Sequence, residues 1–373
     1  MPPLSLYIHF PWCLKKCPYC DFNSHAVRDG IPEDAYVDAL LRDLDAAAAI
    51  AAGRTVHTIF VGGGTPSLLS AAALASLLHG VPRRLTLAAD AEVTLEANPG
   101  AIEAAKFAAF RAAGVTRLSL GVQSFDDAKL AALGRIHSAD EARRAAELAL
   151  RHFGRVNFDL MYGLPGQTLE GARRDIETAV GFGPAHISAY HLTIEPNTEF
   201  HHAPPQLPDD DVAADMQEMI EATLARAAYR HYETSAFARA GEECRHNLNY
   251  WTFGDYLGIG AGAHSKITTE AGIAREARPR APKDYLAHPE SRHWQPVATR
   301  DLAGEFMMNA LRLADGFAAP LFEERTGLPL AGLEDALQLA EREGLLSRDR
   351  ERIAPTMLGQ RFLNRLIGRF LAS

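Results

Sequence analysis

Short apolar runs alternate with longer amphipathic segments through the first half of the chain. The apolar runs are rich in β-branched residues, as buried strands are, and lie at residues 4–10, 56–61, 92–97, 115–120, 155–161 and 186–192. The segments between them have helical periodicity and lie at residues 32–52, 70–78, 101–113, 126–133, 138–152 and 168–180. A strand followed by a helix, repeated six times, predicts a parallel sheet with helical crossovers.

Unusual residues gather where these predicted strands end. Three cysteines follow the first strand and three glycines the second, while Glu96 ends the third. Gln123 follows the fourth strand, Asp159 ends the fifth and His191 lies near the end of the sixth. A site drawn from the ends of all six strands favours a barrel, because an open sheet collects its ligand at one switch point. We therefore predict an α/β fold whose core, residues 1–200, is a partial (β/α)6-type barrel.

The hydrophobic pattern changes after residue 200. A helix is expected from Asp209 to about Tyr229, a strand within residues 230–238, and an Arg- and Pro-rich linker over residues 274–300. We predict that residues 201–298 form an extension and linker, and residues 299–373 a small, mainly helical, winged-helix-like domain. The helices of that domain are expected at residues 306–313, 320–326, 333–343 and 356–371.

Charge and composition exclude some classes of function. The net charge of −9 argues against nucleic acid as a general partner, and the basic face of Arg361, Arg365 and Arg369 is explained as a solvated helix surface. No apolar run is long enough to span a bilayer, and no secretion leader precedes the first strand. Four cysteines, three of them clustered, make a poor disulfide framework and a good cytosolic metal site, so we expect a cytoplasmic protein.

The clustered cysteines Cys13, Cys17 and Cys20 have the spacing C-x3-C-x2-C. Thiolates are soft ligands that bind iron–sulfur clusters or zinc, and both normally take four ligands. The loop supplies three, so a cluster held here leaves one iron open to a ligand that is not protein. Structural zinc, completed by Cys244, His9 or His25, is the alternative, although zinc sites usually place two ligands in each of two knuckles.

This spacing at this place resembles the radical S-adenosylmethionine (SAM) superfamily. The resemblance implies a [4Fe–4S] cluster on Cys13, Cys17 and Cys20, with the amino and carboxylate groups of SAM on the fourth iron. It also implies that Gly63, Gly64 and Thr65 meet the amino-acid end of SAM; glycines admit bare backbone close to a ligand, with N–H groups facing an anion. The other residues predicted to bind the cofactor are Tyr7, Tyr19, Glu96, Gln123, Arg135 and Asp159, of which the last four suit ribose hydroxyls, an ammonium or a carboxylate.

Further motifs narrow the resemblance. The sequences Tyr7-Ile-His-Phe-Pro-Trp-Cys, Gly-Gly-Gly-Thr-Pro-Ser, Gly-Arg135-Ile-His and Asp159-Leu-Met-Tyr-Gly-Leu-Pro-Gly-Gln resemble those of the oxygen-independent coproporphyrinogen III oxidase-like group. The true oxidase has a further cysteine where this chain has Phe22, and an N-terminal extension that is not expected here. Both departures argue against porphyrinogen decarboxylation.

The chain is more similar to the heme chaperones of this group, whose hallmark His-Asn-x-x-Tyr-Trp stands here as His246, Asn247, Tyr250 and Trp251. An imidazole is a good axial ligand for heme iron, and Tyr and Trp offer flat apolar area to a porphyrin face. Without the family, His246 reads as a hydrogen-bonded structural histidine. Cys244 is either an alternative sulfur ligand or an inert buried thiol.

Two hypotheses follow. In the first, the protein binds heme and transfers it to an acceptor protein, possesses no catalytic residue, and uses the [4Fe–4S] cluster with SAM to support loading or transfer. It is expected as a monomer or a cluster-dependent homodimer without a membrane span, in peripheral contact with any membrane-bound acceptor. In the second, it is a radical enzyme in which an electron from the cluster cleaves SAM, and the resulting radical abstracts hydrogen from a porphyrinogen propionate.

Overall fold

The computed structural model describes residues 1–28 and 30–371, and its centre is a 12-stranded mixed sheet. Six strands that are consecutive repeats in the sequence lie side by side and parallel. They are β1 (Leu4–Phe10), β4 (Val56–Gly63), β5 (Leu87–Ala97), β6 (Arg117–Gln123), β7 (Arg155–Tyr162) and β8 (His186–His191). This order confirms the predicted partial (β/α)6-type barrel; within the described residues the sheet ends at β14 and β9 and does not close on itself.

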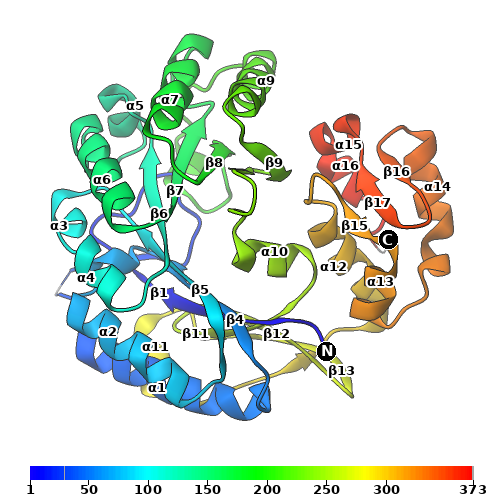
Figure 1. The fold of residues 1–373 in the computed structure, drawn as a ribbon, viewed down its shortest axis with the longest axis horizontal. Helices are drawn as coiled ribbons and strands as arrows, with labels where there is room; N and C mark the ends of the chain where they lie inside the picture. The colour runs from blue at the N-terminus through cyan, green and yellow to red at the C-terminus, as the bar shows by residue number, and fades with distance from the viewer. Residues whose placement is uncertain (29, 372–373) are drawn as a thin grey trace.

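The helices that connect these strands cover the outer side of the curved sheet (Figure 1). Their alanine- and leucine-rich faces are buried against it, and α6 begins with a capping box in which Ser138 and Glu141 satisfy each other's backbone N–H groups. The predicted helix over residues 101–113 is interrupted and forms two short pieces. The helices are α1 (Glu33–Ala51), α2 (Ala71–Gly80), α3 (Ala101–Ala104), α4 (Phe107–Ala112), α5 (Asp127–Ala132), α6 (Ala139–His152) and α7 (Leu169–Phe182).

The sheet continues at both edges with strands from the second half of the chain. β11 (Asp255–Ile259) pairs parallel with β1, so it is a seventh parallel strand that the sequence did not reveal. Beyond it lie β12 (His264–Thr269), β13 (Gly272–Ala277) and β14 (Gln295–Pro296), all antiparallel. At the other edge, after α8 (Glu199–His202) and α9 (Asp210–Arg226), the single strand expected over residues 230–238 is a hairpin of β9 (Arg230–Glu233) and β10 (Ala236–Ala238).

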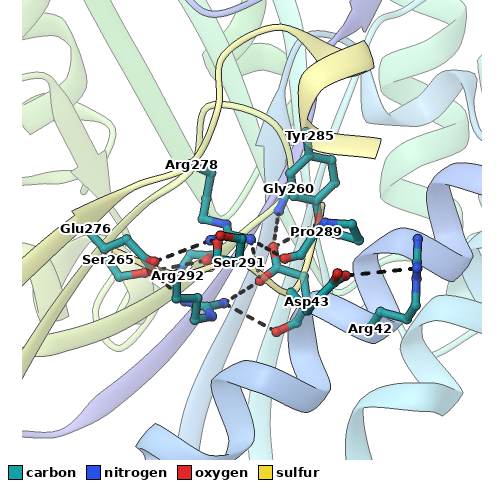
Figure 2. A network of polar contacts seen from close by, with 12 residues as sticks. Arg42, Asp43, Gly260, Ser265, Glu276, Arg278, Tyr285, Pro289, Ser291 and Arg292 are labelled. Carbon is teal, nitrogen blue, oxygen red and sulfur yellow. Dashed lines mark hydrogen bonds and ion pairs between the residues drawn. The ribbon is translucent and has the colours of Figure 1, made fainter. Parts of the chain in front are cut away.

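The expectation that residues 274–300 form a linker is wrong, because this segment carries β13, α11 (Pro282–Ala287) and β14 and is anchored by buried ion pairs (Figure 2). Arg292 donates to Asp43 of α1 at 2.5 Å and to Glu276 at 2.6 Å, and Arg278 lies 3.3 Å from each of the same two carboxylates. Tyr285 adds a hydrogen bond to Asp43 at 2.9 Å. The arginines that suggest solvent exposure in the sequence are therefore paired with buried acids, one of them from α1.

Residues 299–371 form a module around a second hydrophobic core of Phe306, Phe322, Leu337 and Leu366, to which Phe253 and Ile273 of the preceding region also contribute. Its helices pack beside a three-stranded antiparallel sheet, as in a winged helix, and the helix expected over residues 356–371 is broken at Phe362. The elements are α12 (Thr299–Ala310), β15 (Phe317–Ala318), α13 (Ala319–Thr326), α14 (Glu334–Arg342), β16 (Leu346–Arg348), β17 (Arg352–Pro355), α15 (Met357–Arg361) and α16 (Leu363–Ile367). None of the helices within the described residues combines the length and apolarity needed to cross a membrane.

The helix α10 (Arg245–Trp251) lies on the inner side of the sheet, between it and the C-terminal module (Figure 1). It packs against β1, β4 and β11. Glu92 of β5 accepts the backbone N–H groups of Arg245 at 3.4 Å and His246 at 3.2 Å, which places a carboxylate at the positive end of the helix. This contact fixes the start of α10 inside the incomplete barrel.

Candidate functional site

A cavity of about 370 Å³ lies at the carboxyl ends of the parallel strands, where a barrel places its site. The structure brings nearly all of the predicted cluster and cofactor residues to its wall. These are Cys13, Cys17, Cys20, Tyr19, Gly63, Gly64, Thr65, Glu96, Gln123, Arg135 and Asp159. One cavity therefore joins residues from the cysteine loop, the β4–α2 connection, the α5–α6 connection and the strands β4, β5, β6 and β7.

The three cysteines are unpaired thiols on the loop that follows β1, where Cys13 ends the short strand β2 (Trp12–Cys13) beside β3 (His25–Ala26). Thr65 donates a hydrogen bond to Cys13 Sγ at 3.4 Å, and Arg135 donates to Cys17 Sγ at 3.7 Å. Donors and a guanidinium next to sulfur suit thiolates. In the part of the chain that the structure describes, no group of three His, Cys, Asp or Glu side chains converges on a point that would hold a single metal ion.

The glycine run after β4 brings bare backbone to the rim of the cavity. A side-chain carbon at Gly63, whose φ is +115°, would lie 2.5 Å from the ring of His9, and one at Gly64 would lie 2.5 Å from the Trp12 carbonyl. The backbone N–H groups expected to face an anionic ligand already have acceptors within the chain: Gly63 donates to the carboxyl of Glu96 at 3.0 Å and Thr65 to the Trp12 carbonyl at 2.8 Å. The run packs the end of β4 closely against the cysteine loop, and its contact with SAM stays a prediction.

Two carboxyl groups face the cavity from neighbouring parts of the sheet. Burial, followed by the charge of Asp159, raises the pKa of Glu96 from 4.5 to about 8. Burial also raises the pKa of Asp159, while Ser119 and Asn157 each donate to it at 2.8 Å. Such carboxyls favour a ligand that brings hydroxyl donors or a positive charge.

Arg135 and Gln123 complete the polar wall. Arg135 donates to the side chain of Asn98 at 2.6 Å and to the Gly121 carbonyl at 3.0 Å, so its guanidinium is oriented at the cavity. Gln123 has a φ of 66°, a left-handed conformation that non-glycine residues seldom adopt and that often occurs at functional sites. The donor set suits a cluster with a polar nucleoside ligand: three thiols at one end, and carboxyls, an amide and a guanidinium beside them.

Tyr7 is the one predicted cofactor residue that does not line this cavity. Its hydroxyl bonds His9 Nδ1 at 2.9 Å and its ring stacks on Phe60 at 6.3 Å, so it lies on β1 beneath the site. His9 is itself bonded to the Asn23 carbonyl at 2.9 Å. Tyr7 thus has packing and hydrogen-bonding partners that account for its position.

The His-Asn-x-x-Tyr-Trp motif forms α10, and its histidine is buried. His246 Nδ1 bonds the hydroxyl of Thr58 at 2.8 Å and Nε2 bonds the hydroxyl of Tyr250 at 3.1 Å, so both ring nitrogens are occupied. Burial lowers the pKa of His246 to about 3. In this arrangement it is a neutral, hydrogen-bonded histidine.

The other motif residues point elsewhere. Asn247 is half-buried, and the ring of Trp251 lies toward the C-terminal module, where the Arg312 guanidinium is 5.2 Å from its centre. Trp251 Nε1 is buried without a hydrogen-bond acceptor in the described residues. Cys244 precedes the helix with its thiol 3.7 Å from Glu92, and burial raises its pKa to about 11, as expected for an inert thiol.

Several residues at the cavity are not singled out by the sequence analysis. Asn98 holds Arg135, and Ser119 holds Asp159. Met161 and Glu195 also line the wall. Asn98 and Ser119 could have been found, because Asn98 follows Glu96 by two residues and Ser119 points inward in the period of β6, whereas Glu195 lies in a loop that carries no pattern.

Comparison with known proteins gives concordant results. Residues 7–179 match the radical SAM superfamily, and residues 297–362 match the HemN C-terminal domain. The chain is 50% identical over its full length to the heme chaperone HemW of Escherichia coli, covering 99% of that protein, and 47% identical to that of Haemophilus influenzae, covering 98%. The structure of the E. coli coproporphyrinogen III oxidase HemN, a radical SAM enzyme, superposes with a TM-score of 0.84 at 25% identity, over all of this chain and 90% of the other.

Proposed function

This chain belongs to the HemW family within the radical SAM superfamily, and on that premise we propose that it binds heme and passes it to an acceptor protein. The proposal includes a [4Fe–4S] cluster held by Cys13, Cys17 and Cys20 and an exchangeable SAM beside it. Its support is one arrangement: the three-cysteine cavity and the helix that carries the His-Asn-x-x-Tyr-Trp motif occupy the same incomplete barrel.

The residues around the cavity suit these roles. A bound cluster would supply electrons and an open iron for the amino and carboxylate groups of SAM. Arg135 is placed to hold a carboxylate, since it already reaches Cys17 and the rim of the cavity. Glu96 would favour the cationic cofactor, because a positive charge nearby stabilises the ionised carboxylate that burial disfavours.

Heme is proposed to contact α10 or its surroundings, with His246 as axial ligand. Binding through Nε2 requires the Tyr250 hydroxyl to release that nitrogen from its 3.1 Å hydrogen bond. Trp251 and Tyr250 would then offer ring surface to the porphyrin. The identity of the acceptor protein is left open by this proposal. A monomer or a cluster-dependent homodimer stays a prediction.

The second candidate is a radical enzyme acting on a porphyrinogen. The cavity favours it, because every side chain expected around SAM except Tyr7 is present there. Against it stands Phe22, which is 60% exposed at the cavity rim where the oxidase group carries a cysteine.

An anaerobic experiment with reconstituted protein separates the two candidates. The chaperone proposal predicts saturable heme binding, followed by transfer of the bound heme to an apo heme protein, and no conversion of coproporphyrinogen III in the presence of SAM and a reductant. Sustained formation of protoporphyrinogen would contradict the chaperone proposal. Absence of any heme binding would contradict it as well.

A further inference from the structure

A second cavity, of about 490 Å³, lies between the β8–β9 edge of the sheet and the C-terminal module. One wall carries Tyr162, His191 and His231 from the sheet. The other wall carries Arg312 from the turn after α12 and Arg361 and Arg365 from α15 and α16. We call this space the interdomain cleft. Its volume is in the range of ordinary small-molecule sites.

The charge of the cleft is opposite to that of the protein. The chain has a net charge of −9, yet three arginines and two histidines line the cleft, and none of the Asp or Glu side chains among the described residues does. Two acids pair with the arginines of the cleft: Glu218 of α9 with Arg361 at 2.5 Å, and Glu343 with Arg365 at 3.2 Å. Glu343 also holds Arg369 at 2.5 Å, so two guanidinium groups share that one carboxylate.

The pairing that engages these arginines is weak enough to be exchanged. The side chains of Arg361 and Glu218 are 46% and 56% exposed, and ion pairs in water contribute little. A carboxylate entering the cleft could take the place of Glu218 on the Arg361 guanidinium, whose planar fork suits bidentate carboxylate binding.

The cleft also offers a flat apolar surface. Phe362, at the break between α15 and α16, is 53% exposed and lines the cleft beside Leu363. On the sheet side the rings of Tyr162 and His191 are stacked 5.1 Å apart. Aromatic faces on opposite walls, with cations beside them, suit a planar molecule with anionic groups at its edge.

We propose that the interdomain cleft binds a planar tetrapyrrole through its propionate carboxylates, held by Arg361 and Arg365. This inference rests on the proposed heme function and gives it a location for the anionic edge of the ligand. Two contacts connect the cleft to the rest of the site. His191 lines both the cleft and the cysteine cavity, and Arg312 lies over the ring of Trp251. A tetrapyrrole here would lie between the motif helix and the cofactor cavity.

The test is an anaerobic titration of the full-length, reconstituted protein with heme and with metal-free protoporphyrin IX. Arg361→Gln and Arg365→Gln are each expected to weaken binding by about tenfold, the cost of a charged hydrogen bond to carboxylate. The loss should be the same for both porphyrins, because the arginines act through the carboxylates and not through iron. Unchanged affinity in both variants, or a loss for heme alone, would contradict the proposal.

Two further variants keep the result from being mistaken for general damage. Arg369→Gln is the matched control, because Arg369 shares Glu343 with Arg365 but does not line the cleft; its binding should equal that of the unmodified protein. Glu218→Gln frees Arg361 and is expected to tighten binding a few-fold. Weaker binding by Glu218→Gln would contradict a direct role for the guanidinium.

An esterified ligand distinguishes a failure of the cleft assignment from a failure of the proposed heme function. Heme dimethyl ester lacks the carboxylate charge, so it should bind the unmodified protein as weakly as heme binds the Arg361→Gln/Arg365→Gln double variant. The double variant should bind heme and heme dimethyl ester with equal affinity. If the unmodified protein binds no heme at all, the proposed function fails. If it binds heme and its ester equally well, only the cleft assignment fails.

Discussion

The strand–helix repeat of residues 1–200 and the unrepeated region of residues 230–300 show how differently a motif can be placed. In the repeat, residues far apart in sequence meet at one cavity, because parallel strands send all their carboxyl ends to the same edge. In the unrepeated region, the most distinctive motif forms a helix inside the barrel whose histidine is fully hydrogen-bonded. Topology locates the first kind of motif, whereas tertiary packing alone locates the second.

The cysteine cavity gives the largest expected effect in this comparison. Cys13→Ser, Cys17→Ser and Cys20→Ser should each abolish or nearly abolish a stable cluster, because each removes one of the three proposed protein ligands. Iron and sulfide content after anaerobic reconstitution measures this. Cys244→Ser is the control from the unrepeated region: its thiol faces Glu92 beneath α10, so this variant should keep the full cluster. If Cys244→Ser loses the cluster and Cys13→Ser keeps it, the assignment of Cys13 as a cluster ligand is wrong.

The buried ion pairs of Figure 2 test whether the unrepeated region is an integral part of the fold. Asp43→Ala leaves Arg278 and Arg292 short of a buried partner and should lower the free energy of unfolding by about 3–5 kcal/mol. The neighbouring Arg42→Ala should change the free energy of unfolding by less than about 0.5 kcal/mol. Arg42 is 57% exposed, and its ion pair with Glu290 is long, at 3.9 Å. Urea denaturation of both variants measures the two changes in the free energy of unfolding. If both changes are small and equal, residues 274–300 behave as a linker.

Glu96 tests the electrostatics of the cavity through pH. Its pKa is raised from 4.5 to about 8, so its contribution to stability is full below pH 4.5 and is lost as the pH rises toward 8. Glu96→Gln does not titrate and should gain about 2–3 kcal/mol relative to the unmodified protein between pH 5 and pH 7 in the absence of SAM. Urea denaturation at a series of pH values measures the difference, and a difference that does not vary with pH would rule out a buried, protonated Glu96.

The smallest expected effect concerns the histidine of α10. Tyr250→Phe removes the hydroxyl that occupies His246 Nε2 and should lower the free energy of unfolding by about 0.5–1.5 kcal/mol. If His246 binds heme iron, heme affinity should rise a few-fold in this variant and fall in Tyr250→Phe combined with His246→Ala. Thr58→Val, which releases Nδ1 on the other side of the ring, is the matched control for stability. If heme affinity changes neither in Tyr250→Phe nor in its combination with His246→Ala, the axial ligand lies elsewhere.

The sequence predicts the fold where local pattern and topology agree. The six parallel strands and their helices have clear hydrophobic periods, and the cavity follows from their order. β11 escapes prediction because Gly258 interrupts a short apolar run that pairs with β1, more than two hundred residues earlier in the chain. The buried arginines Arg278 and Arg292 escape it because nothing in the sequence shows that Asp43 of α1 awaits them.

The same distinction applies to the site. Thr65 and Glu96 could be placed at the cavity because they follow or end a strand, and Asp159 lies three residues before the end of β7. Tyr7 also lies three residues before the end of its strand, β1, but it does not line the cavity, and its hydroxyl bonds His9 instead. The hydrogen bonds of His246 to Thr58 and Tyr250 depend on how α10 packs. The interdomain cleft needs two domains in place, so no single segment of sequence announces it.

The most direct test of the central claim is the electron paramagnetic resonance spectrum of the anaerobically reconstituted, reduced protein with and without SAM. A cluster held by Cys13, Cys17 and Cys20 has one iron without a protein ligand, so added SAM should change the spectrum in the unmodified protein, and more weakly in Arg135→Gln. A protein that holds only zinc at this loop, or a cluster spectrum that SAM leaves unchanged, would contradict the account.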